Sequence, residues 1–388
     1  MVTGVNNFVP ERLIQARNAR GLMSVSLSEM IGVSPTTISL YEKGTQKPKQ
    51  STIELMGKVL NLPVSFFLST IEIDKPDKLF YRSMSSATKS SRLRAESKHE
   101  WALDIIDYLG EYFEFPELNL PDFELDSNFE DITENLIENI AESLRELWHL
   151  SDRPIPNLIQ LLERNGIFVY RTHMNSEKLD AFSDYRLPNP IIALSSQKNN
   201  YYRSRFDAAH ELGHLILHKN VDKRSLNKSS DFKLIEDQAN YFASVFLLPQ
   251  SSYSKDLWSP SLDAFRSLKS IWNVSIGMQI FRAKSLQFID EKEEKRLWIN
   301  RTRRGWNKSE PLDNSTEPEA PSLIRKSFKM LMDENVKTKA EISTDLKLKP
   351  SDIESIFELP KGFLSHDNEP NAVRLKTTGA KILEFPKK

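Results

Sequence analysis

The sequence of 388 residues contains no cysteine, which excludes disulfide bonds, thiolate metal ligands and a cysteine nucleophile. Glycine is also scarce, at 12 residues, and this disfavours glycine-rich phosphate loops and repeated β folds. No apolar run approaches the ~18 residues that a membrane span requires. The first residues, 1–10, lack the basic and apolar segments of a secretion signal. These absences favour a cytoplasmic protein without a membrane partner, long enough for two or three domains.

The sequence has almost no overall excess of positive or negative charge, because the net charge is only −1. The charges are nevertheless segregated. Residues 100–150 hold fifteen acidic residues and one basic residue, whereas residues 1–70, 75–98 and 266–308 carry net charges of +3, +5 and +7. Such blocks indicate separate surfaces. The acidic block is interpreted either as the solvated face of an amphipathic helix or as a surface that shields or mimics a nucleic acid.

The first seventy residues carry the start and stop signals of five short helices. One helix is expected over 12–20. Gly32 can supply a tight turn, because glycine tolerates the left-handed conformation. Ser34 followed by Pro35 is typical of a helix start. A tight glycine turn before a capped helix predicts a helix-turn-helix bundle.

Residues 12–68 resemble the xenobiotic-response-element (XRE) family of phage-repressor-type DNA-binding domains, through the string RLIQARNARGLMSVSLSEMIGVSPTTISLYEKGTQKPKQSTIELMGKVLNLPVSFFL. The resemblance implies a double-stranded DNA operator as partner, with the second helix of the motif in the major groove. By position, the residues facing the bases would be Pro35, Thr36, Thr37 and Ser39. Those contacting phosphates would be Lys43, Lys47 and Lys49.

The string departs from the family at three positions. Met23 and Ser24 stand where the family usually has Thr-Gln, and Leu40 stands where Arg or Lys is common. A bundle kept for dimerisation or for recognition of a protein partner therefore remains an alternative, and a homodimer is compatible with both interpretations.

A second motif lies in residues 204–218, which read SRFDAAHELGHLILH. Ser204 with Asp207 resembles a capping box and predicts the start of a helix. His210 and His214 are four residues apart and so share one helix face, and Glu211 adjoins the first histidine. This is the H-E-x-x-H pattern, in which two imidazoles bind Zn²⁺ and the glutamate acts as general base.

A catalytic zinc ion keeps three protein ligands, and without cysteine the third must be His, Asp or Glu. His218 continues the series, but three ligands on one straight helix converge poorly. Glu236, 22 residues after His214, lies in an apolar-faced helix and is the preferred ligand. Asn240, one turn later, is expected beside the site. His218 remains an alternative ligand or a neighbour of the site.

A resemblance to the ImmA/IrrE family of metallopeptidases rests on two strings, FDAAHELGHLILH and EDQANYFASVFLLP. Shorter strings resemble the family's small sheet (GIFVYRTHM, LDAFSDYR and PIIALSS) and a stretch after its peptidase core (RGWNKSEP). The resemblance implies a zinc endopeptidase in which His210, His214 and Glu236 bind the metal and Glu211 is catalytic. It also implies a protein substrate, such as a helix-turn-helix repressor or an antitoxin or toxin partner, in stress, phage or mobile-element control.

The expected fold class is α+β and mainly α, with an N-terminal five-helix bundle, a zincin-like peptidase domain and a C-terminal helical extension. The expected divisions are a DNA-binding domain (10–70), a helical and acidic connector (71–125), the peptidase domain (126–260), its helical extension (261–308), a linker (309–322), a small helical unit (323–365) and a flexible tail (366–388).

Two further alternatives remain open. The zincin-like domain could sense a ligand or partner without catalysis, in a DNA-binding repressor or antitoxin. A group of basic and aromatic residues near the end of the expected helical extension could bind single-stranded DNA by charge and stacking and so activate the enzyme. Alternatively, these residues could form a surface loop over the core. The residues concerned are Trp298, Arg301, Arg303, Arg304, Trp306 and Lys308. A transition-state donor is not fixed by the sequence, and the candidates are Tyr185, Tyr201, Tyr202 and His173.

Overall fold

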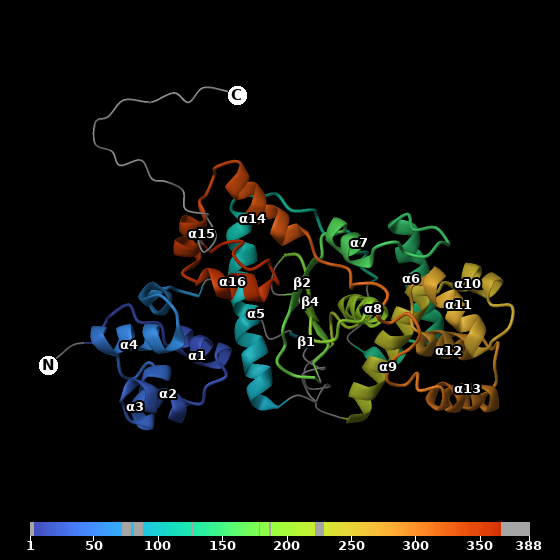
Figure 1. Cartoon of the computed structure of the whole chain (residues 1–388), viewed down its shortest axis with the longest axis horizontal. Coiled ribbons are helices and arrows are strands. Elements are labelled where there is room, and N and C mark those ends of the chain that lie inside the picture. Colours follow the sequence, from blue (N-terminus) through green and yellow to red (C-terminus); the bar gives the residue numbers. More distant parts are fainter. Residues whose placement is uncertain are drawn as a thin grey trace, which may run out of the picture.

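The computed structural model describes residues 4–71, 79–80, 88–123, 125, 128–177, 179–185, 188–221 and 229–365. The expected flexible tail, 366–388, lies outside the described residues. The described part of the chain is mainly helical with one small sheet, which confirms the expected α+β class (Figure 1). None of its helices combines the length and apolarity needed to cross a membrane.

The N-terminal bundle confirms the predicted helix-turn-helix. Gly32 ends the second helix with φ of 72°, in the left-handed region that glycine tolerates. The Ser34 hydroxyl accepts a hydrogen bond from the backbone N–H of Thr37 at 3.1 Å and so caps the third helix. The bundle consists of α1 (Pro10–Ala19), α2 (Ser24–Ile31), α3 (Pro35–Glu42), α4 (Gln50–Leu60) and a 3-10 helix (Val64–Leu68).

The sheet has the strand order β1-β3-β4-β2, in which β2 and β4 are parallel and β3 is antiparallel to both of its neighbours. Every residue of β2, β3 and β4 is buried, so helices cover both faces. One face contributes Val169 and Ile192 to an apolar core that also includes Leu212 and Phe242. The strands are β1 (Leu79–Phe80), β2 (Phe168–Thr172), β3 (Ala181–Asp184) and β4 (Ile191–Ser195).

The long helices α8 (Tyr201–Leu217) and α9 (Ser229–Leu247) pack against each other beside this sheet, and they carry the metal motif (Figure 1). Gly213 permits their close approach, because a Cβ atom there would lie 3.1 Å from the Phe242 ring and 3.3 Å from the Ala239 carbonyl oxygen. The helices of this part are α6 (Glu134–Leu147), α7 (Leu158–Arg164), α8 (Tyr201–Leu217), α9 (Ser229–Leu247), α10 (Gln250–Asp256), α11 (Leu262–Trp272), α12 (Ile276–Ser285) and α13 (Glu291–Arg303).

The helix α5 (Lys89–Gly110) lies between the bundle and the sheet (Figure 1). It packs on α1, and Arg12 pairs with Asp104 at 2.5 Å. On its other side, His99 is fully buried and hydrogen-bonds Asp184 of β3 at 2.6 Å. Three C-terminal helices also pack on α5, namely α14 (Leu323–Asp333), α15 (Lys339–Leu346) and α16 (Pro350–Ile356). One apolar core therefore unites the bundle, α5, the second sheet face and these helices.

Residues 309–322 contain no helix or strand, as expected for a linker, but buried ion pairs and hydrogen bonds hold them against α7, α8, α11 and α12. The buried Glu310 carboxylate pairs with Lys269 at 2.9 Å and accepts from the backbone N–H of Ile276 at 2.7 Å. The buried Glu319 pairs with Arg205 and accepts from the N–H of Ile159. The segment follows the domain surface because both carboxylates find buried cations and free helix-terminal N–H groups.

Candidate metal centre

The helix α8 positions both histidines of the motif. It begins at Tyr201, where the Asn200 side chain accepts a hydrogen bond from the N–H of Arg203 at 2.9 Å. The predicted cap at Ser204 is therefore wrong, since Asn200 caps four residues earlier. Ser204 lies inside the helix and accepts a hydrogen bond from Arg171 instead.

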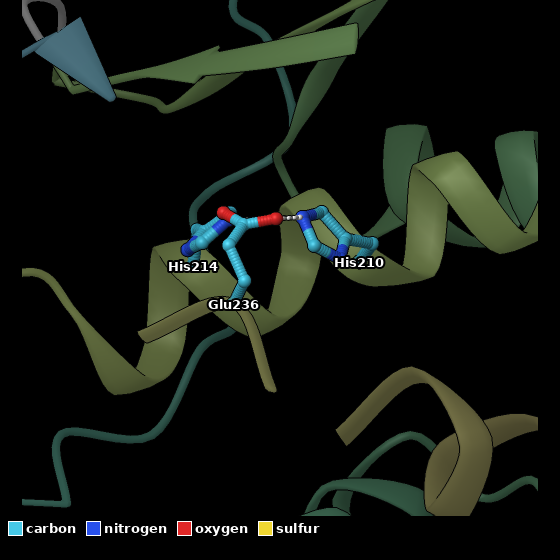
Figure 2. A group of neighbouring side chains, drawn as sticks. All are labelled: His210, His214 and Glu236. Carbon is cyan, nitrogen blue, oxygen red and sulfur yellow. Dashed lines mark hydrogen bonds and ion pairs between the residues drawn. The ribbon is translucent and has the colours of Figure 1, made fainter. Parts of the chain in front are cut away.

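The structure brings His210, His214 and Glu236 together (Figure 2). Their ligand atoms form a small triangle. The Nε2 atoms of His210 and His214 are 3.0 Å apart. Glu236 Oε2 lies 3.3 Å from Nε2 of His210, and Glu236 Oε1 lies 3.0 Å from Nε2 of His214. Ligands about 2.0–2.2 Å from a tetrahedral zinc ion are themselves about 3.3 Å apart. The donor set and spacing therefore fit Zn²⁺, with a fourth direction left for substrate or water.

His218 does not join this triangle but lies behind His214. Its Nδ1 is 3.0 Å from Nδ1 of His214, and its Nε2 is 3.0 Å from Oε1 of Gln238. The Gln238 amide donates to the carbonyl oxygens of Phe129 and Ile132 at 2.7 and 2.9 Å, so its Oε1 must accept. His218 therefore donates from Nε2 and accepts at Nδ1. Burial lowers the pKa of His218 to about 4, which agrees with a neutral ring.

This chain of hydrogen bonds fixes the tautomer of His214. Because His218 accepts at Nδ1, His214 must donate from Nδ1, and its Nε2 lone pair then faces the metal position. Asn240 has the same relation to His210, with Oδ1 2.9 Å from His210 Nδ1. Each imidazole is thus oriented by a hydrogen bond at Nδ1, on the side of the ring away from the metal position.

Glu211 is buried beside the ligand triangle. The Ser183 hydroxyl of β3 donates to its Oε2 at 2.7 Å. Burial raises the pKa of Glu211 to about 8, and the bond from Ser183 acts in the opposite direction. A cation held by the triangle would favour the carboxylate form. The arrangement provides a proton acceptor next to a metal position.

The cleft around these residues has a volume of about 200 Å³. Sequence reasoning missed several residues at or behind it. Arg203 and Asp207 had a signal, since they precede His210 by seven and three residues on the same helix face. Ser183, Asp180 and Gln238 had none, because tertiary packing brings them there. Of the proposed transition-state donors, none is among the residues that line the cleft, and the Tyr185 hydroxyl donates to the Leu215 carbonyl oxygen instead.

The second predicted site lies on the exposed surface of α3 and its flanking loop. Pro35 and Thr36 are exposed, and Thr37 and Ser39 are half-buried. The Thr37 hydroxyl lies 2.8 Å from that of Ser34, so the cap engages it. The three lysines are exposed, and of these Lys47 donates to the Asn6 carbonyl oxygen at 2.9 Å; the other two are Lys43 and Lys49.

Comparison with known proteins finds two families. Residues 162–284 match the model of the IrrE N-terminal-like domain of peptidase family M78, and residues 13–67 match the helix-turn-helix family. The chain is 36% identical over 63 residues to the cryptic phage CTXphi transcriptional repressor RstR of Vibrio cholerae, which is 16% of this chain and 57% of the repressor. It is also 36% identical over 59 residues to an uncharacterized HTH-type transcriptional regulator of Sinorhizobium medicae, 15% of this chain and 42% of that protein. The aligned regions thus span about half the length of these relatives.

Proposed function

We infer that the protein is a DNA-binding transcriptional regulator that is also a Zn²⁺-dependent endopeptidase, because its chain joins a helix-turn-helix domain to an IrrE-like peptidase-family domain. The observation that carries the peptidase proposal is the convergence of His210, His214 and Glu236 beside Glu211. The likeness to a phage repressor supports operator binding through α3. Because operator binding requires access to the chromosome, we propose a cytoplasmic location. The substrate would be another regulator, a helix-turn-helix repressor or an antitoxin or toxin partner.

The proposed hydrolysis divides between the metal and Glu211. When bound, Zn²⁺ polarises the scissile carbonyl and lowers the pKa of water. Glu211 takes one proton from the attacking water as its oxygen bonds to the carbonyl carbon, and returns that proton to the amine nitrogen as the C–N bond breaks. Ser183 holds one oxygen of Glu211, so the carboxylate keeps its orientation through both transfers.

The test is Glu211→Gln, which keeps size and hydrogen bonding but cannot accept the proton. We expect cleavage of a purified regulator encoded beside this gene to slow by ~10²–10⁴-fold, with unchanged zinc content. Glu334→Gln changes an exposed glutamate at the C-terminal cap of α14 in the same way and serves as the matched control. Cleavage by Glu211→Gln at the parent rate would show that the mechanism is wrong.

A second candidate is a repressor or antitoxin whose zincin-like domain senses a ligand or partner without catalysis, and the likeness to a phage repressor favours it. Cleavage that a chelator abolishes supports the peptidase. Partners that remain intact, together with tight operator binding, support the sensor.

A further inference from the structure

A groove of about 500 Å³ opens beside the metal cleft. It lies between α8, α12, α13 and the segment that follows α13. The cleft and the groove share four lining residues, namely Arg203, Phe206, Asp207 and Asn240. The Phe206 ring centroid is 6.0 Å from that of the ligand His210. The groove therefore continues the cleft and starts one helical turn from the metal position.

Four of the seventeen residues that line the groove are aromatic, namely Phe206, Phe281, Trp298 and Trp306. Phe281 of α12 is 41% exposed, and Trp298 and Trp306 are half-buried. Gly277 lets Trp298 lie directly against α12, because a Cβ atom at this position would be 3.3 Å from the indole ring. Apolar side chains held open to solvent next to a reaction centre are typical of a pocket that takes an apolar group.

Each of the two arginines that line the groove is paired with a carboxylate. Arg301 pairs with Glu310 at 2.9 Å, and Arg203 pairs with Asp180 at 2.7 Å. Lys308, among the described residues, has no carboxylate within 4.0 Å. The groove thus offers one unpaired cation rather than a basic track, which disfavours a polyanion as occupant.

The indole faces are also engaged within the protein. The Arg301 guanidinium lies 5.4 Å from the Trp298 ring centroid, and that of Arg304 lies 4.9 Å from the Trp306 ring centroid. Arg304 in turn pairs with the Asp263 carboxylate at 2.7 Å. Stacking of successive nucleic-acid bases needs open ring faces. This arrangement favours insertion of one side chain into the groove over stacking of a single strand.

We propose that this groove selects the substrate by binding a large apolar or aromatic side chain of a peptide, next to the scissile bond. The proposal rests on the proposed peptidase function. An extended peptide advances about 3.3–3.6 Å per residue, so a side chain adjacent to a carbonyl at the metal position reaches a groove that begins at Phe206. The volume accommodates the largest side chains and disfavours substrates with small residues there.

Two peptide hydroxamates test the proposal, identical except for a phenylalanine or an alanine side chain next to the metal-binding group. Their affinities are measured by calorimetry on zinc-loaded Glu211→Gln protein, where no cleavage interferes. We expect the phenylalanine probe to bind at least ~10-fold tighter, as one buried aromatic side chain allows. In Phe281→Ala and Trp306→Ala the preference should fall severalfold, with unchanged zinc content. Trp258→Ala, which alters a tryptophan that is 92% exposed, is the matched control and should keep the preference.

Equal affinity for the two probes, binding of neither, or a preference that survives both groove variants would overturn the proposal. Displacement of the phenylalanine probe by a thymidine oligonucleotide would also overturn it and would assign the groove to single-stranded DNA. Failure of the proposed function looks different: the phenylalanine probe binds selectively, yet the parent protein cleaves no regulator. The groove would then be the ligand pocket of a sensor.

Discussion

The N-terminal bundle and the metal centre position their functional side chains in opposite ways. In the bundle, the candidate DNA contacts follow one another along α3 and its loop, and they are exposed or half-buried. At the metal centre, the key groups come from α8, α9 and β3, and Glu211 and His214 are buried. A surface contact can be changed without disturbing its neighbours, whereas each group of the metal centre is held by another.

The difference has a chemical reason. Phosphates and base edges are large external partners, and an exposed helix can reach them without a preformed cavity. A metal ion needs several donors at one point, and the imidazoles must present the correct nitrogen. Such convergence requires close packing of α8 on α9, which Gly213 permits.

The largest effect is expected from His214→Ala, which removes a ligand and the end of the hydrogen-bond chain. Zinc should be lost in metal analysis and cleavage should become undetectable, while operator binding in a gel-shift assay stays unchanged. His149→Ala, at an exposed histidine, is the control. A tenfold loss of operator affinity in His214→Ala would break the comparison, because it would show that the two regions act as one.

A smaller effect is expected from Gln238→Leu, which tests whether the chain behind His214 sets its tautomer. Loss of such a supporting group typically weakens metal affinity by ~10–100-fold, measurable by competition with a chromogenic chelator. Gln279→Leu is the matched control, because Gln279 is also buried and bonded to a carbonyl but lies in α12. Both variants should lose stability, and only Gln238→Leu should lose zinc affinity. Equal zinc affinities would contradict this role.

The smallest effects are expected in the bundle. Thr36→Ala should reduce affinity for one operator base by about 1 kcal/mol, the low end for a base contact. Lys43→Ala should instead weaken binding to all sequences and lower the salt slope by about 1. Fluorescence anisotropy over a salt series, with the operator and a scrambled duplex, separates the two. An equal loss on both duplexes in Thr36→Ala would remove α3 from sequence recognition.

Local spacing was sufficient to predict much of the site. The four-residue interval of the histidines identified two ligands, and the separate amphipathic helix around Glu236 favoured it over His218 as the third; the structure brings these ligand atoms together. Gly32 and Ser34 similarly predicted the turn and the start of α3.

What depends on tertiary packing could not be predicted. Nothing near Ser183 in the sequence indicates Glu211, because only the packing of α8 on β3 brings the two side chains together. The start of α8 was misplaced because Asn200 and Ser204 are both good caps, and packing decides between them. The composition of residues 309–322 indicated a linker and did not indicate that two of its carboxylates are buried, because composition does not show which cations lie opposite them.

The central position of α5 has a consequence for how the molecule can be divided. Its buried side chains belong to the same apolar core as those of the bundle and of one sheet face, and the buried His99 is hydrogen-bonded to both Asp184 and Tyr170. Cutting the chain at the end of the bundle would uncover this core on both fragments. The protein should therefore melt in one cooperative transition, and exchanging its DNA-binding bundle for that of another regulator would require a matching α5.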